Sequence, residues 1–212
     1  MSLTDEVYAK LKDEIVHVVR RPGDVVYEAE LAAEFRVSKT PVREALRLLA
    51  HTGWIVVLPR RGYLVRPVEL RDIRDIFALR RMVEPTLAAE AATAATADDV
   101  AALESLVAQQ SRPGDESPTI ALDAARRFHL ALADISGSHR IQSMLSELVD
   151  EVRRLHHLLP NVADHITSAE ELRAHTLILG AVRARDAEKA RALMTEHLNE
   201  VAHTLVKGFA GG

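Results

Sequence analysis

Between residues 39 and 65 the spacing of the apolar residues changes from helical to strand-like, and this change limits the folds open to the N-terminal region more than any other feature. Pro41 suits a first helical turn, and Gly53 suits the residue after a helix end. Four apolar residues between them lie three or four positions apart and share one helix face: Val42, Ala45, Leu46 and Leu49. The apolar runs 54–58 and 63–65 then predict a β-hairpin with its turn at 59–62.

Two more helices are predicted ahead of this segment, at 4–19 and at about 28–35. Three short helices followed by a hairpin are typical of a winged helix-turn-helix. In that fold the third helix enters the DNA major groove, and the hairpin, or wing, reaches the neighbouring backbone or minor groove. The N-terminal region is therefore predicted to bind double-stranded DNA.

The distribution of charge favours the same function. The chain carries a net charge of −4, but residues 1–68 have a balance of +2 and the remainder −6, and the window 36–66 holds seven basic residues against the single acid Glu44. Lys39, Arg43 and Arg47 lie four residues apart on the outer face of the third helix, with Arg60 and Arg61 at the hairpin tip. Isolated ridges of this kind are usually solvated surface charges. Their coincidence with the hairpin arginines in one 30-residue window favours DNA binding.

After Pro67 and Val68 the pattern is helical throughout, so we expect two domains, at 1–68 and 69–212. Helices are predicted at 70–93, 98–110, 118–136, 138–159, 166–184 and 187–207. The predicted fold class is mostly α: a winged helix-turn-helix domain and an all-α antiparallel bundle of about six helices.

Three histidines of the predicted bundle lie within apolar stripes: His129, His175 and His197. A single inward histidine is more often a core residue with a hydrogen-bond partner. Three of them on separate helices predict a divalent metal site, for Zn, Ni or Mn. Arg80 and Glu84 also fall in an apolar stripe, where they form either an internal ion pair or part of a ligand site.

The N-terminal residues resemble the DNA-binding domain of GntR-family transcriptional regulators. The resemblance rests on four segments: Pro22-Gly23, Glu30-Leu31-Ala32, the ten-residue block 37–46 (VSKTPVREAL) and Pro59-Arg60-Arg61-Gly62. It implies DNA contacts by Lys39 and Arg43 and minor-groove entry by Arg61 and Gly62. The full set of predicted DNA-binding residues is Ser38, Lys39, Thr40, Arg43, Arg47, Arg60, Arg61 and Gly62. Two residues depart from the family pattern: Arg36 stands where the turn often has glycine, and Ala29 replaces a polar or basic residue.

The C-terminal residues resemble the FCD effector domain of the FadR branch, through Phe128-His129, the segment 171–175 (ELRAH) with 181–186 (AVRARD), and the segment 194–198 (MTEHL). The resemblance implies a metal held by one Asp and three His, with the Asp one helical turn before the first His. Ala125 occupies that position, and Asp123, six residues before His129, lies about 120° round the helix from the face of His129. Water or a carboxylate of the effector would supply the missing ligand. The resemblance also implies that Arg80 binds an anionic effector.

Together these features predict a DNA-binding transcriptional regulator, a repressor, that binds a palindromic operator as a homodimer and responds to a small carboxylate metabolite. Two alternatives stay open at this stage: a metal-responsive regulator without an organic effector, and a metal-dependent hydrolase. We expect no enzyme activity, because no carboxylate is placed by spacing as a general base near His129. The absence of cysteine excludes disulfides and thiolate sites. Without a signal peptide pattern or an 18-residue apolar run, a cytoplasmic protein with no membrane partner is expected.

Overall fold

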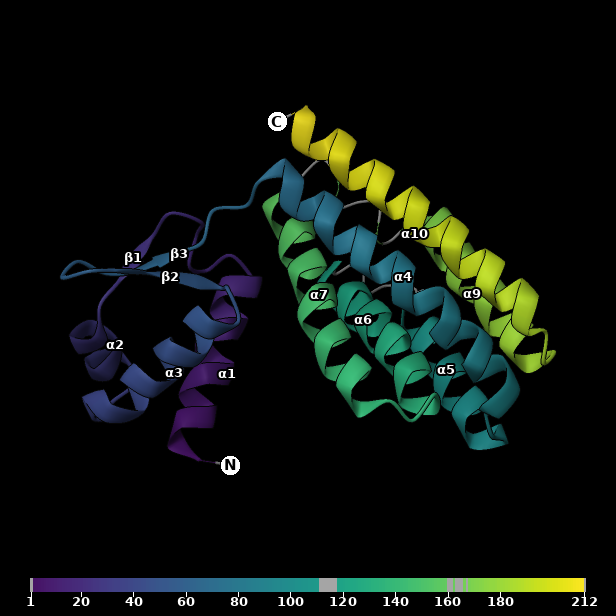
Figure 1. The fold of residues 1–212 in the computed structure, drawn as a ribbon, viewed down its shortest axis with the longest axis horizontal. Helices are drawn as coiled ribbons and strands as arrows, with labels where there is room; N and C mark the ends of the chain where they lie inside the picture. Colours follow the sequence, from purple (N-terminus) through teal and green to yellow (C-terminus); the bar gives the residue numbers. More distant parts are fainter. Residues whose placement is uncertain (1, 111–117, 160–161, 163–165, 167, 212) are drawn as a thin grey trace. The chain divides into compact units, whose positions relative to one another are not determined.

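The computed structural model describes residues 2–110, 118–159, 162, 166 and 168–211. The chain divides into two compact units, Met1–Glu69 and Leu70–Gly212 (Figure 1). The first unit contains three helices and a three-stranded sheet, and the second contains helices only among its described residues. The predicted fold class, a winged helix-turn-helix followed by a helical domain of about six helices, is confirmed.

The first unit is built from α1 (Leu3–Val16), β1 (Val25–Val26), α2 (Glu28–Glu34), α3 (Lys39–His51), β2 (Ile55–Leu58) and β3 (Gly62–Val65). The strand order is β1-β3-β2 and both pairings are antiparallel, with Val25 opposite Leu64 and Leu58 opposite Gly62. The predicted hairpin is therefore β2 and β3. The sequence pattern missed β1, because two residues are too few to show an alternation.

The core of the first unit uses the predicted helical stripes. The apolar face of α3 is fully buried and packs against α1 and β2, in a core that also contains Leu11, Ile15 and Trp54. Burying side chains of this size contributes about 1.5–3 kcal/mol each. Because this face of α3 is fixed in the core, its opposite face is turned to solvent.

The first helix ends three residues before the predicted boundary. His17 caps α1, and Val18 takes the left-handed backbone conformation with φ of 60°. Beyond it, Arg20 forms ion pairs with Glu14 at 2.7 Å and Glu34 at 2.8 Å. These tertiary contacts turn the chain toward α2 and override the helical spacing of the local sequence.

The second unit is a bundle of α4 (Leu70–Ala94), α5 (Ala97–Gln110), α6 (Pro118–Ile135), α7 (His139–Leu158), α9 (Ala169–Arg183) and α10 (Ala187–Ala210). Figure 1 shows α10 lying along α4, with α5, α6 and α7 beneath them. The α9 helix begins at Ala169 and not at 166, because the Ser168 side chain caps it by accepting a hydrogen bond from the Glu171 N–H at 3.1 Å. In the parts of the chain that are described, no helix is long and apolar enough to cross a membrane.

Candidate functional site

The solvent face of α3 carries the predicted DNA-binding residues of the first unit. Ser38 is the N-cap of α3, and its side chain makes no capping hydrogen bond. The hydroxyl and the N–H groups of the first helical turn are therefore placed to meet an anion. The predicted residues of the N-cap and helix are all exposed: Ser38, Lys39, Thr40, Arg43 and Arg47.

Arg43 forms an ion pair with an acid that lies outside the basic segment 36–66 of the sequence. Its guanidinium donates to Glu28, the first residue of α2, with Nη2 at 2.9 Å and Nε at 3.0 Å from Oε2. The Tyr63 hydroxyl of β3 donates to Oε1 of the same carboxylate at 3.2 Å. The hydrogen bonds from Arg43, and to a lesser degree Tyr63, lower the pKa of Glu28. The lack of acids around α3 is thus a property of the sequence window and not of the folded surface.

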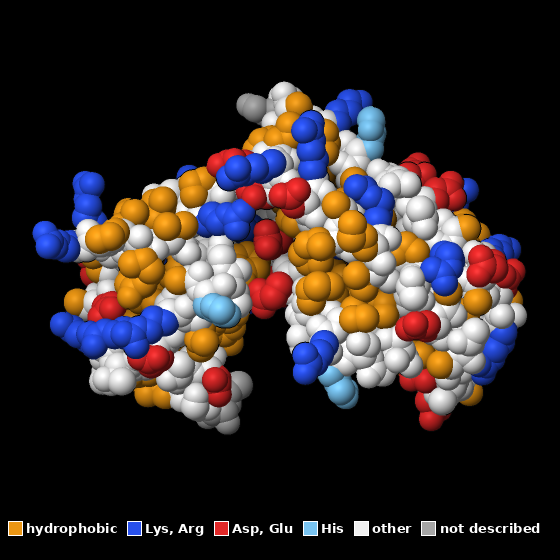
Figure 2. Space-filling view, viewed as in Figure 1, with side chains coloured by type: hydrophobic (Ala, Val, Ile, Leu, Met, Phe, Trp, Pro, Cys, Tyr) orange, Lys and Arg blue, Asp and Glu red, His pale blue; other side chains and the backbone are white. Residues whose placement is uncertain are grey.

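The turn of the wing depends on two residues in the left-handed backbone region. Arg60 has φ of 63° and Gly62 has φ of 92°. A Cβ atom at Gly62 would lie 2.6 Å from the Val26 carbonyl oxygen, so glycine is required there. Arg60 and Arg61 are exposed, and Figure 2 shows basic side chains at the hairpin tip and beside α2 and α3.

Arg36, at the turn between α2 and α3, also has a positive φ, of 56°. Arg36 stands where the turn of the family often has glycine, and its backbone takes the conformation that glycine adopts more readily. Left-handed backbone at a residue with a Cβ costs about 1–2 kcal/mol. The core contacts of α2 and α3 offset that cost.

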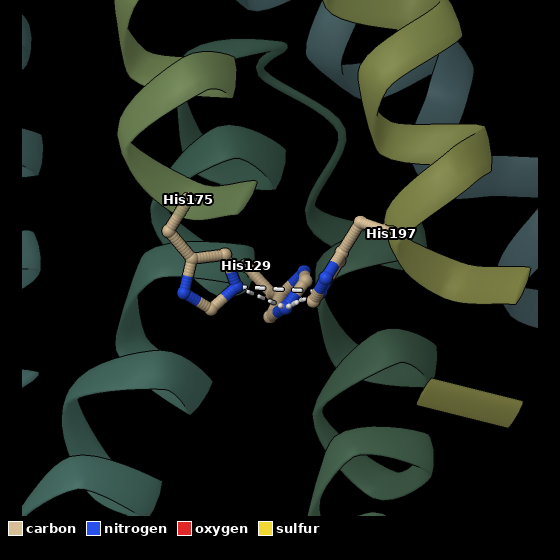
Figure 3. Close-up of side chains that lie close together, drawn as sticks. All are labelled: His129, His175 and His197. Atoms are coloured by element: carbon tan, nitrogen blue, oxygen red, sulfur yellow. Dashed lines mark hydrogen bonds between the residues drawn. The ribbon is translucent and has the colours of Figure 1, made fainter. Parts of the chain in front are cut away.

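The second unit brings the three predicted histidines together in its interior. His129 of α6, His175 of α9 and His197 of α10 are buried, and their Nε2 atoms lie 3.3, 3.3 and 3.4 Å apart (Figure 3). Ligand atoms at about 2.0–2.1 Å from a tetrahedral metal ion lie roughly 3.3–3.4 Å from one another. The three imidazoles therefore have the spacing of three ligands on one face of a tetrahedral site, and they form a candidate metal centre.

Two neighbouring side chains orient these imidazoles. His175 Nδ1 lies 2.6 Å from Gln110 Oε1 of α5, and the Gln110 Nε2 donates to the Leu106 carbonyl oxygen at 3.4 Å, which fixes the amide orientation. His129 Nδ1 lies 2.5 Å from Glu84 Oε2 of α4. The Gln110 acceptor places the His175 proton on Nδ1, whereas His129 Nδ1 has the Glu84 carboxylate beside it without a hydrogen bond of good geometry. The Nε2 lone pairs then point at one another, which is stable when a cation lies between them.

The protonation states of the site also fit a metal. Burial, together with the neighbouring histidines and Arg80, lowers the pKa of His175 and His197 well below the usual value. Both imidazoles are therefore neutral at pH 7 and able to bind a metal. Burial raises the pKa of Glu84, but Arg80 and His129 outweigh it and lower that pKa to about 2. Burial also raises the pKa of Glu171 to about 8, although Arg80 opposes the shift.

A small cavity of about 30 Å³ adjoins the histidines. Its lining includes His129, His197, Ala125, Arg80 and Glu171. The carboxylate of Glu171 lies 3.6 Å from His175 Nε2 and 3.7 Å from His197 Nδ1. The volume holds about two water molecules, so a larger molecule enters only if side chains move.

Two other charged residues considered in the sequence lie near the site, Arg80 and Asp123. Arg80 is buried and forms an ion pair with Glu84, which was one of its two sequence interpretations, and it also lines the cavity. Asp123 is half exposed, with Arg153 at 3.9 Å, and it is absent from the three-histidine cluster. It therefore does not replace the carboxylate missing at Ala125.

Sequence reasoning missed the other groups that surround the histidines. Glu171 was part of a family motif but received no role, and Glu84 was considered only with Arg80. Gln110 ends a predicted helix, and nothing in its local sequence marks it. Arg126 and Arg153 line the same cavity and were also missed. An inward position on a predicted helix was the one available indication for these residues.

Comparison with protein families gives two matches that together span most of the chain. Residues 3–65 match the family described as bacterial regulatory proteins, gntR family. Residues 75–200 match the FCD domain. The first match covers the helices and the wing, and the second covers the bundle and all three histidines.

Individual proteins show the same similarity. The chain is 29% identical to the HTH-type transcriptional repressor RspR of Escherichia coli (strain K12), over 96% of this chain and 89% of the relative. It is 32% identical to a regulator in an unstable DNA locus of Streptomyces ambofaciens, over 92% of this chain and 82% of the relative. The crystal structure of a putative GntR regulator from Rhodococcus sp. RHA1 superposes with a TM-score of 0.82 at 27% identity, over 98% and 99% of the two chains. All three are transcriptional regulators, in agreement with the expectation that the chain is not an enzyme.

Proposed function

The chain belongs to the GntR family of DNA-binding transcriptional regulators, the branch with a C-terminal FCD domain, and on that premise we propose that it is a repressor controlled by a small organic acid that binds beside a metal in the helical domain. The observation that carries the proposal is the spacing of 3.3–3.4 Å between the three Nε2 atoms, beside a cavity lined by Arg80. This arrangement supplies a cation site and a guanidinium to the same space.

In the proposed site the three histidines would hold a divalent cation, which would supply positive charge to an oxygen ligand. Gln110 would keep the Nε2 atom of His175 unprotonated, and Glu84 would help to orient His129. Arg80 donates to a carboxylate of the effector, since its planar guanidinium can donate to both carboxylate oxygens at once. Arg80 already pairs with Glu84, so the effector must share or displace that contact.

For the DNA-binding unit we propose that α3 occupies the major groove and the wing the neighbouring minor groove or backbone. Lys39 and Arg43 would contact base edges, with Arg43 exchanging its contact with Glu28 for a guanine. The remaining proposed contacts, to phosphate oxygens and the minor groove, involve Ser38, Thr40, Arg47, Arg60, Arg61 and Gly62. Glu28 lies close enough to keep the Arg43 guanidinium in a defined position until DNA is bound.

The proposed regulator acts as a homodimer on a palindromic operator, with half-site centres about 34 Å apart. Support comes from the second unit, where three large apolar side chains are solvent-exposed on α4 and α7: Leu79, Met82 and Met144. Figure 2 shows apolar side chains gathered over these two helices. Apolar surface of this kind is typical of a contact between proteins.

The test starts with selection of binding sites from random duplex DNA by the full chain, followed by binding titrations on the selected sequence. We expect an inverted repeat, occupied by two chains in analytical ultracentrifugation. Zn, Ni or Mn bound with a stoichiometry of one per chain, and a small organic acid that weakens DNA binding only when the metal is present, would support the proposal. The variant His175→Ala should lose both effects, whereas His203→Ala, at an exposed position of α10, should keep them.

A regulator that responds to the metal alone is a second candidate, and the small cavity favours it, since 30 Å³ admits an ion and water without rearrangement. Calorimetry of the metal-loaded chain against a panel of organic acids separates the two candidates. Heat from any acid that also changes DNA affinity excludes the metal-only mechanism. DNA binding that follows metal concentration and ignores every acid excludes the organic effector.

A further inference from the structure

Three arginines line the cavity beside the histidines, and each comes from a different helix. Arg126 of α6 and Arg153 of α7 face it together with Arg80. Both approach the buried carboxylate of Asp150 on α7. Neither arginine has a role in the site as described so far.

Each of these arginines has a carboxylate nearby, but the contacts of Arg153 are the weakest of the three. Arg80 is paired with Glu84. Arg126 donates to both oxygens of Asp150, at 2.5 and 3.3 Å, and to Ser146 Oγ at 2.9 Å. Arg153 has a contact of 3.3 Å with the Asp150 oxygen that Arg126 already engages, and it lies 3.9 Å from the half-exposed Asp123.

Arg153 also has donor capacity left over. Its Nε atom is buried and has no hydrogen-bond acceptor among the residues that the structure describes. The guanidinium side chain is 13% exposed and lines the cavity. A buried charged donor in this position requires an acceptor from the cavity itself.

We propose that Arg153, supported by Arg126, forms a second anion site in this cavity, so that the effector carries two anionic groups and is a short dicarboxylic acid. The inference rests on the proposed function, since the first carboxylate is the one placed beside Arg80 and the metal. Arg126 precedes His129 by three residues, a rise of about 4.5 Å along α6. Because Arg126 and Arg153 share Asp150, we expect the second anion site to lie within about one helical turn of His129, a spacing that suits carboxylates joined by two or three carbon atoms.

A purely structural role for these residues predicts something different. If Arg126, Asp150 and Arg153 only tie α6 to α7, loss of Arg153 changes stability but not the choice between acids. Arg126 remains to compensate Asp150 in that variant, so the fold should persist. This makes Arg153, and not Arg126, the position to substitute.

The experiment compares acids of equal chain length on the full, metal-loaded protein by calorimetry: succinate against butyrate, and glutarate against valerate. We expect the dicarboxylate to bind at least tenfold more tightly within one of these pairs. In Arg153→Gln that ratio should fall below threefold, while the affinity for the monocarboxylate stays within twofold. Arg153→Lys, which keeps the charge but loses Nε, should give an intermediate ratio. Arg127→Gln, on the exposed face of α6, is the matched control and should keep the ratio.

The outcomes separate this inference from the proposed function. Equal affinity for the two acids of each pair, or a ratio unchanged in Arg153→Gln, overturns the second anion site and leaves a monocarboxylate effector in place. Absence of binding by all four acids to the metal-loaded wild type overturns the organic effector, and the second anion site with it. Thermal melting of each variant, compared with the wild type, establishes that a lost ratio does not come from unfolding.

Discussion

Replacing Gln110 by leucine should weaken metal binding although Gln110 is not a ligand. Its Oε1 atom lies 2.6 Å from His175 Nδ1, and both side chains are buried. Leucine has a similar size and no acceptor, so the Nδ1–H would remain buried without a partner, at a cost of about 1–3 kcal/mol. The imidazole avoids that cost by moving its proton to Nε2, the atom that faces the other two histidines. Either result lowers the affinity of the three histidines for a metal ion.

The expected loss of metal affinity is roughly 10- to 100-fold, which is typical for residues that orient metal ligands and corresponds to about 1.4–2.7 kcal/mol. The same loss is visible in thermal stability. At a metal concentration of 100 times the wild-type Kd, the wild type gains about 2.7 kcal/mol from the metal. The variant would gain about 1.4 kcal/mol after a tenfold loss and about 0.4 kcal/mol after a hundredfold loss.

The assay is a competition titration of Zn and of Ni against a chromophoric chelator, on full-length protein first stripped of metal. Gln109→Leu provides the control, because the neighbouring Gln109 contacts Ser105 and Arg127 and does not face the histidines. A folded Gln110→Leu protein that binds metal within twofold of the wild type would refute the orienting role. An equal loss in Gln109→Leu would show that the effect comes from α5 in general.

Three further predictions concern single residues. Arg43→Ala should weaken binding to the selected operator by about 1–3 kcal/mol and relax one base preference, and unchanged affinity in a gel-shift titration removes Arg43 from the base-reading residues. Glu28→Gln should strengthen binding to scrambled DNA and lower the preference for operator, since it removes a negative charge and the fork partner of Arg43; fluorescence anisotropy that shows both affinities rising equally contradicts this. Metal binding at pH 7 should release close to one proton, because Glu171, with a pKa of about 8, is largely protonated before a cation arrives; calorimetry in two buffers measures the release, which Glu171→Gln should abolish.

The features predictable from sequence were those encoded by local spacing. The buried face of α3 and the inward positions of His129, His175 and His197 follow from helical periodicity alone. The strand β1 was missed because two residues show no alternation, and the end of α1 was missed because tertiary contacts decide it, such as those of Arg20 with Glu14 and Glu34.

The partners of the functional side chains were less predictable for the same reason. Glu28 lies 15 residues before Arg43, and Gln110 lies 65 residues before His175. Spacing on one helix says which way each side chain points, but not which side chain of another helix it meets. Resemblance to the FCD domain identified the missing carboxylate at Ala125, yet the acids that do approach the histidines, Glu84 and Glu171, emerged only from the packed bundle.

Five helices each bring one group to the candidate metal centre: Glu84 from α4, Gln110 from α5, His129 from α6, His175 from α9 and His197 from α10. A cation held there stabilises the packing of the bundle as a whole, and not a single helix. Among these elements α4 is the one that continues the chain from the wing, with four residues between β3 and its first turn. An effector that draws Arg80 away from Glu84 changes the contacts that hold α4 against His129. We therefore expect the response to the effector to reach the DNA-binding unit through a displacement of α4.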